Sequence, residues 1–237
     1  QKTVIATHQP NFFPWLGYFK KVQEADVFVF LNEVPLPRGR QGTWTNRVKM
    51  LVGGKAQWAT CPVSTAYANQ PINQIRIADE HSWRDKLVKR LYHEYRNAPA
   101  FAEMYPWLKA MILRDVNFLS EYNISNIKEI CSALDLQARF VRQSEIDDAS
   151  VRQLQGSERL NRICEVLGAG VYLAGDGAYS YEQPEVYARS GIQLQRLGFQ
   201  HPVYPQYQRG EFVPGLSILD ALLNLGTERT RDLVLSA

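Results

Sequence analysis

The residue types best suited to chemistry stand together near the start of the chain. His8 and Asn11 flank Gln9 and Pro10, directly after a short apolar run. An imidazole changes protonation state near neutral pH, so His8 can act as a general acid or base. The Asn11 amide can donate a hydrogen bond to a carbonyl oxygen or an oxyanion. The segment therefore predicts His8 and Asn11 as catalytic residues, with Gln9 as a substrate contact.

A structural role for His8 is the alternative, because its ring could instead bond backbone groups and fix the turn. Pro10, Pro14 and Gly17 follow within a few positions, and they constrain the backbone into an unusual loop. That arrangement favours a functional His8.

Two further segments are candidates for anion binding. Asn46 and Arg47 lie within a strand-like run, and a guanidinium holds phosphate or carboxylate through two parallel hydrogen bonds. Gly175 and Asp176 follow another apolar run, where backbone N–H groups can approach an anion. An ordinary strand-to-helix turn is the alternative for Gly175 and Asp176, which form no known phosphate-binding fingerprint. We assign all four to substrate binding.

The last third of the chain adds four candidates. His201 and Gln206 lie in a loop with two prolines, which predicts either a second polar wall of the same cleft or a structured turn. Ser217 and Asp220 are three residues apart before an apolar helix, which is capping-box spacing with Asp in place of Glu. Capping is the expected role of both. The functional alternative makes Ser217 a further catalytic residue and Asp220 a substrate contact.

Alternating strand and helix patterns must position these residues. Apolar runs at 4–6 and 27–31 bracket a helix expected over 14–24, which predicts a parallel pair of strands. The carboxyl ends of parallel strands are the usual ligand-binding edge of an open α/β sheet. The pattern predicts an α/β fold with a Rossmann-like, mostly parallel sheet. Further strands are expected at 137–142, 170–174 and 192–196, with helices at 157–167 and 183–190.

The middle of the chain predicts a helical insertion. Apolar residues recur at helical spacing over 82–96, 99–112 and 118–134. Before them, the sequence predicts a hairpin from strands at 44–50 and 57–63, then a strand at 72–77. A last helix over 216–224 should end before Gly226. No linker is apparent, so we expect a single domain over 1–237 with a helical subdomain near 80–135.

Composition limits the function. The net charge of +3 is too small to predict a nucleic-acid partner, and no apolar run reaches the ~20 residues of a membrane span. The three cysteines have no metal-ligand spacing, and no histidine pair has helical ligand spacing, so we expect no metal. An odd number of thiols without a visible leader favours a cytoplasmic protein. The sequence indicates no particular cofactor or oligomeric state.

The motifs resemble those of the WbqC-like family, which is found with genes for O-antigen and other bacterial polysaccharides. The resemblance runs in order along nearly the whole chain. It rests on the segments at 8–21, 25–29, 46–49, 172–178, 201–206 and 215–226. Similar proteins tend to carry paired aspartates after the second strand, where this chain has Asn32 and Glu33.

The resemblance implies an enzyme or binding protein of lipopolysaccharide or natural-product synthesis, with a small-molecule substrate such as a nucleotide sugar. We favour a transferase that moves an acyl or aminoacyl group to an amino sugar. In that hypothesis His8 is the base, Asn11 and Ser217 hold the oxyanion, and Arg47 holds phosphates. One alternative is an HxGH-like nucleotidyltransferase or ATP-dependent ligase, although Trp15 to Tyr18 replace the paired histidines of that motif. The other is a non-catalytic sugar- or nucleotide-binding protein.

Overall fold

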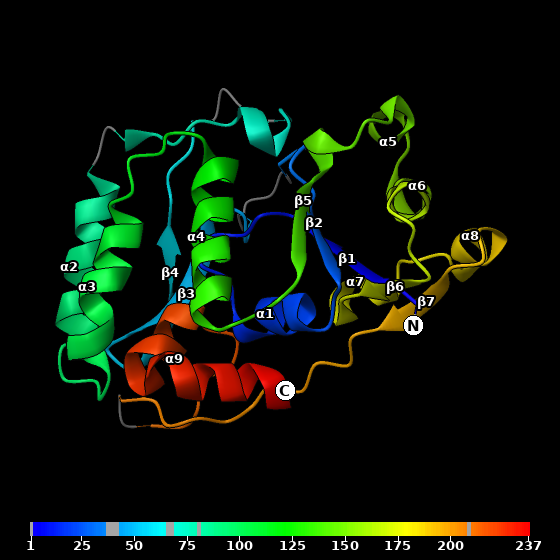
Figure 1. Cartoon of the computed structure of the whole chain (residues 1–237). Helices are drawn as coiled ribbons and strands as arrows, with labels where there is room; N and C mark the ends of the chain where they lie inside the picture. The colour runs from blue at the N-terminus through cyan, green and yellow to red at the C-terminus, as the bar shows by residue number, and fades with distance from the viewer. Residues whose placement is uncertain (1, 37–42, 65–68, 80–81, 208–209) are drawn as a thin grey trace.

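A parallel sheet of five strands forms the centre of the protein, in the order β5-β2-β1-β6-β7 (Figure 1). The structure is a computed structural model that describes residues 2–36, 43–64, 69–79, 82–207 and 210–237. The α/β, Rossmann-like prediction is confirmed. The strands are β1 (Val4–His8), β2 (Val27–Phe30), β5 (Arg139–Arg142), β6 (Val171–Ala174) and β7 (Gln193–Arg196).

The order in which the chain adds strands creates a topological switch point beside β1. The chain builds β1, β2 and β5 toward one edge, then crosses over to place β6 and β7 on the other side of β1. The crossovers that follow β1 and β6 therefore leave the sheet in different directions and open a crevice between the two carboxyl ends. Such crevices are where open α/β sheets bind ligands.

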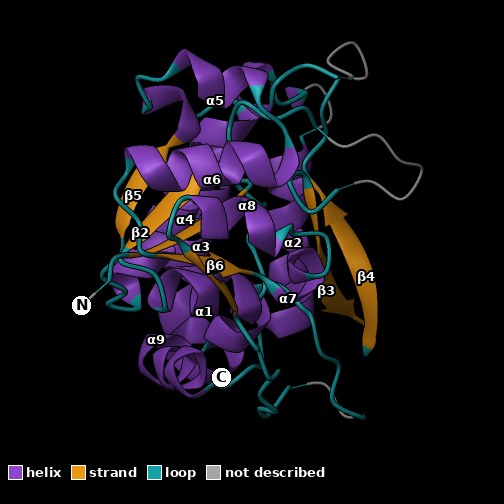
Figure 2. Cartoon of the chain, turned by 90° about the vertical axis from the view of Figure 1, so that its right-hand side faces the viewer, coloured by secondary structure: helices purple, strands orange, loops and turns teal. Residues whose placement is uncertain are grey.

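Helices cover both faces of the sheet, and this explains the apolar character of its central strands. All four residues of β2 and all four of β6 are buried. Ala6, Phe28 and Leu173 pack into the core that contains α1 (Leu16–Gln23) and α9 (Ile218–Ser236). Ile5, Val29 and Tyr172 face the core beneath α6 (Gly156–Val166) and α8 (Pro184–Arg189). Figure 2 shows α1 and α9 below the strands and α6 above them.

The predicted helical segment is present as α2 (Trp83–Tyr95), α3 (Phe101–Ile112) and α4 (Leu119–Ala133). The buried apolar residues of these helices belong to the same core as those of α1 and α9. The predicted hairpin consists of β3 (Arg47–Val52) and β4 (Lys55–Thr60), which pair with each other and not with the main sheet. Its turn is made by Gly53 and Gly54, both with positive φ, as a tight hairpin requires.

A strand was the wrong prediction for residues 72–77. Residues Ile72–Gln74 form a single 3₁₀ turn, η2, after Pro71, and the backbone beyond it makes only isolated bridges. Ile72 and Ile75 are buried, so the apolar spacing reflects core packing and not strand pairing. Two short helices, α5 (Ala149–Gln153) and α7 (Asp176–Tyr179), were not predicted because neither is long enough to show an apolar period.

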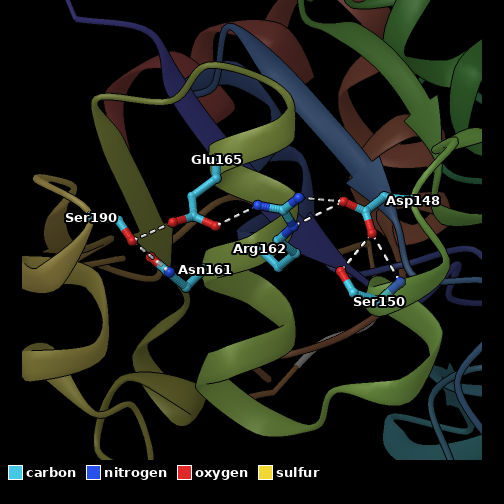
Figure 3. A network of polar contacts seen from close by, with 6 residues as sticks. All are labelled: Asp148, Ser150, Asn161, Arg162, Glu165 and Ser190. Atoms are coloured by element: carbon cyan, nitrogen blue, oxygen red, sulfur yellow. Dashed lines mark hydrogen bonds and ion pairs between the residues drawn. The ribbon is translucent and has the colours of Figure 1, made fainter.

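A network of hydrogen bonds and ion pairs connects α6 to residues beside α5 and α8 (Figure 3). The Arg162 guanidinium bonds Asp148 beside α5, with an Nη2–Oδ2 distance of 2.7 Å, and also bonds Glu165 on its own helix. Ser190, after α8, donates to Glu165 Oε1 at 2.6 Å and accepts from the Asn161 amide at 2.8 Å. The network orients the helices that pack on this face of the sheet.

The prediction that the helix over 216–224 stops at Gly226 is confirmed. Gly226 has φ 75° and ψ −178°, a non-helical conformation that separates two helical segments within α9. The second segment was not predicted, and its residues Thr230 and Val234 are fully buried.

We predict that Gly226→Ala lowers the free energy of unfolding by roughly 1–3 kcal/mol, because only glycine adopts this backbone conformation readily. Urea denaturation of the purified variant measures the effect. Gly177→Ala is the control, since no neighbouring atom lies within 4 Å of the added methyl group and its φ is not positive. Equal stabilities of the two variants would contradict the prediction.

Candidate functional site

A cavity of about 470 Å³ opens at the switch point, between the carboxyl ends of β1 and β6. Most of its lining comes from three places: the end of β1, the first two turns of α1, and the turn that follows β6. Of the residues predicted to form the site, the cavity brings together His8, Gln9, Gly175 and Asp176.

His8 is the last residue of β1, and its ring forms part of the cavity wall. The ring packs against Tyr18, with 4.7 Å between ring centroids, and against the edge of Trp15 at 5.9 Å. Its Nδ1 atom is buried without a hydrogen-bond partner in the described part of the chain. Burial, and secondly the charge of Lys21, lower the pKa of His8 well below its usual value. The imidazole is therefore neutral at pH 7 and available as a proton acceptor.

Lys21 is a buried cavity residue that the sequence reasoning missed. It lies on α1, is only 5% exposed, and lines the cavity together with Gly17, one helical turn earlier. Its Nζ donates to the carbonyl oxygen of Thr7 at 2.7 Å. Burial lowers the pKa of Lys21 to about 8, although the nearby Glu182 and Asp176 carboxylates oppose the shift.

Aromatic rings make up much of the wall, and Gly17 lets them approach the helix. Trp15, Tyr18 and Phe199 all line the cavity. A Cβ atom added at Gly17 would lie 2.8 Å from Trp15 Nε1 and 3.1 Å from Phe199 Cδ1. A side chain at position 17 would therefore displace this wall, which is suited to stacking against a sugar ring or another flat ligand.

Asp176, in the turn after β6, holds the Phe199 side of the cavity wall in place through hydrogen bonds. The Asp176 carboxylate accepts hydrogen bonds from the backbone N–H groups of Gly198 and Phe199, at 3.1 and 2.8 Å, and from Arg196 Nε at 2.6 Å. These donors help hold the pKa of Asp176 below its usual range, although partial burial opposes them. The second carboxylate of the cavity, Glu182, accepts from the hydroxyls of Ser157 and Tyr187, each at 2.6 Å.

The remaining predicted site residues do not line this cavity. Asn11 is 2% exposed, and its Oδ1 has no hydrogen-bond partner among the described residues. The guanidinium of Arg47 stacks on Trp58, 3.8 Å from the ring centroid, on the hairpin. Asn46 donates from its amide to the carbonyl oxygen of Cys61 at 3.2 Å.

His201 and Gln206 both stabilise the loop in which they lie. His201 Nδ1 donates to the carbonyl oxygen of Pro202 at 2.9 Å, and its Nε2 accepts from Gly215 N at 3.0 Å. The Gln206 amide bonds both backbone groups of Val213. The structured-turn interpretation of this loop matches these contacts.

Ser217 caps α9 as expected, because its Oγ accepts from Leu219 N at 3.2 Å and donates to the carbonyl oxygen of Phe13 at 2.7 Å. Capping is the wrong interpretation for Asp220. Its carboxylate is fully buried and accepts from the hydroxyls of Tyr95 and Tyr204, each at 2.7 Å. Burial raises the pKa of Asp220 despite these donors.

We predict that Lys21→Met raises the free energy of unfolding near pH 7 by about 1–3 kcal/mol. The fall in pKa from 10.5 to about 8 means that the fold disfavours the charged amine, by ~3 kcal/mol below pH 8. Loss of the bond to Thr7 offsets part of the gain. This penalty disappears as the pH rises from 8 past 10.5. In urea denaturation, the difference in the free energy of unfolding between Lys21→Met and wild type should therefore be smaller at pH 10 than at pH 7.

Lys20→Met is the matched control, because Lys20 is also buried but forms an ion pair with Glu24 at 2.8 Å. We expect it to lower the free energy of unfolding or leave it unchanged. A Lys21→Met protein less stable than wild type at pH 7 would contradict a strained, functional lysine.

In the described part of the chain, no helix is long and apolar enough to span a bilayer, and no three His, Cys, Asp or Glu side chains are grouped so as to hold a metal ion.

Comparison with known proteins identifies the family. A protein of Mycobacterium tuberculosis (strain ATCC 25618 / H37Rv) named "Uncharacterized protein Rv1507c" is 29% identical over 228 residues, which cover 94% of each chain. No solved structure matches the chain significantly. The family model described as "WbqC-like protein family" matches residues 9–232, nearly the whole chain. The chain therefore belongs to the WbqC-like protein family.

Proposed function

We propose that the protein transfers an acyl or aminoacyl group to an amino sugar or a related amine, bound in the cavity at the end of β1. The observation that carries the proposal is a neutral, buried imidazole at His8 in the same cavity as the buried ammonium of Lys21. A base and a fixed cation in one partly dry cavity are what acyl transfer requires.

The two side chains have separate roles in this reaction. The acceptor amine attacks the carbonyl carbon of the acyl donor while His8 takes a proton from the amine nitrogen. Negative charge then develops on the carbonyl oxygen, and the Lys21 ammonium stabilises it. When the tetrahedral intermediate collapses, the bond to the leaving group breaks and the leaving group receives the proton from His8.

The charges of the cavity disfavour a polyphosphate ligand. Its described lining contains two carboxylates, those of Asp176 and Glu182, and one cation, that of Lys21, and Arg196 already pairs with Asp176. A lining with a single cation holds a triphosphate poorly, because a triphosphate needs several cations or a metal ion. This charge balance disfavours the nucleotidyltransferase and ATP-dependent ligase alternatives. The aromatic wall suits a sugar ring, and the WbqC-like family supports an amino sugar of surface-polysaccharide synthesis.

Three earlier assignments change in this proposal. Lys21 replaces Asn11 and Ser217 as the group that stabilises the oxyanion, because neither of those side chains lines the cavity. Arg47 has no role in this proposal, since it does not line the cavity and its guanidinium stacks on Trp58. Ser217 instead bonds the carbonyl oxygen of Phe13, in the loop after β1.

We predict that His8→Gln lowers kcat/KM about 10²–10⁴-fold, because the variant keeps a polar side chain but cannot accept the proton. The measurement is turnover of purified protein with amino sugars and thioester donors. His93→Gln is the control, since His93 is exposed on α2, away from the cavity. A His8→Gln enzyme with full turnover would exclude the base. Tight binding of an amino sugar by wild-type protein, with no turnover of any donor, would favour the binding-protein alternative.

We also predict that the rate falls as the pH rises above about 8, where Lys21 loses its proton. The neutral form of His8 persists across this range, so the alkaline limb belongs to Lys21 alone. In Lys21→Arg the side chain stays protonated to much higher pH, so the fall in rate should also shift to higher pH. A pH–rate profile unchanged by Lys21→Arg would contradict the oxyanion role.

A further inference from the structure

A second cavity of about 290 Å³ lies at the same edge of the sheet, at the carboxyl ends of β2 and β5. Glu33 follows β2, Gln143 follows β5, and Asn73 belongs to the 3₁₀ turn beside them. Arg152 of α5 and Arg159 of α6 complete the wall. The polar network around Arg162 fixes these two helices relative to each other.

Two side-chain oxygens in this wall are buried without partners in the described part of the chain. Gln143 is 1% exposed and its Oε1 accepts no hydrogen bond, and the same holds for the buried Oδ1 of Asn73. An unpaired buried acceptor costs about 1–3 kcal/mol, so two of them in one cavity wall favour occupancy of the cavity by a group that supplies donors. The two oxygens therefore suit a ligand with hydroxyl or ammonium donors.

The charged groups of the wall leave one positive charge unbalanced. Arg152 Nε bonds both carboxylate oxygens of Glu33, at 3.0 and 3.1 Å, so these two neutralise each other. Arg159 Nε donates to the carbonyl oxygens of Val151 and Leu154, which fixes the plane of its guanidinium. Among the described residues, Arg159 forms no ion pair. A guanidinium fixed in this way is suited to bind an oxyanion through its Nη atoms.

We propose that this cavity is a second binding site, specific for a small oxyanion that also carries hydroxyl or ammonium donors. Arg159 binds the carboxylate or phosphate group, and Gln143 and Asn73 accept hydrogen bonds from the donors of the ligand. The site adjoins the first cavity, because Leu31 and Leu160 line that one while Glu33 and Arg159 line this one. It is a separate site, and its assignment does not depend on acyl transfer at His8.

Three molecules of the same carbon skeleton test the proposal on the whole chain. Glycerate, glycerol 3-phosphate and glycerol share their hydroxyl groups and differ in the terminal group. Calorimetric titration at constant ionic strength should show saturable binding of at least one of the two anions and none of glycerol at the same concentration. The anion that binds with the higher affinity shows whether the site prefers a carboxylate or a phosphate.

Gln143→Met is the deciding variant. It should lower the affinity for the more tightly bound anion about tenfold or more. The free energy of unfolding should stay unchanged or rise, because the substitution removes an unpaired buried oxygen. A purely structural glutamine would instead lower stability and spare binding. Arg159→Lys should also weaken binding, since it keeps the charge and loses the planar fork. Arg189→Gln, at an exposed ion pair with Glu158, is the control and should bind as wild type does.

The Lys21→Met variant distinguishes binding at the two cavities. It alters the first cavity and should leave anion binding at the second site intact. Failure of both anions to saturate would overturn the proposal, and so would wild-type affinity in both Gln143→Met and Arg159→Lys. Loss of binding in Lys21→Met would also overturn it by assigning the anion to the first cavity. Loss of turnover in His8→Gln with unchanged anion binding bears only on acyl transfer, so the two proposals fail independently.

Discussion

The hydrogen bond between Lys21 Nζ and the carbonyl oxygen of Thr7 is the interaction on which the site depends. It joins the second turn of α1 to the end of β1 and sets how the helix leaves the sheet. Burial chiefly lowers the pKa of His8, and the ammonium that makes this bond lowers it further. One buried cation thus orients the helix, helps to keep the imidazole neutral and supplies the positive charge of the cavity. The fold tolerates an unfavourable buried charge there because opposing carboxylates partly compensate it.

The opposite side of the loop after β1 is held by α9, from the far end of the chain. Ser217 bonds the Phe13 carbonyl through its hydroxyl, and Ile218 N bonds the Pro14 carbonyl at 2.8 Å. Phe13 needs this support because it is a buried non-glycine residue with φ 37°. The residues that sequence reasoning grouped as one site therefore divide into two sets. His8 and Gln9 face the ligand cavity, whereas Ser217 constrains the loop that carries them.

The parts of this structure that were predictable from the sequence depend on local patterns. Apolar runs and the helix between them gave the parallel pair β1–β2, and the strand end gave the position of His8. What was not predictable depends on contacts across the fold. The tyrosines that bond Asp220 lie 125 and 16 residues away, and the ring beneath Arg47 belongs to the partner strand of the hairpin. A cation on a helix looks solvated in the sequence, so only the packing of α1 shows that Lys21 is buried.

The two cavities follow from one topological fact, which is that β1, β2, β5 and β6 end at the same edge of the sheet. The first lies where the chain reverses direction, between β1 and β6, and the second lies beyond β2, under α5 and α6. Their charges differ: in the first, Arg196 pairs with Asp176 and Lys21 lies near Glu182, whereas the second has an unbalanced guanidinium at Arg159. The second site is therefore the one suited to an anion. Leu31 and Leu160 line the first cavity, and Glu33 and Arg159, close to them along the chain, line the second, so the two sites are neighbours at one edge of the sheet.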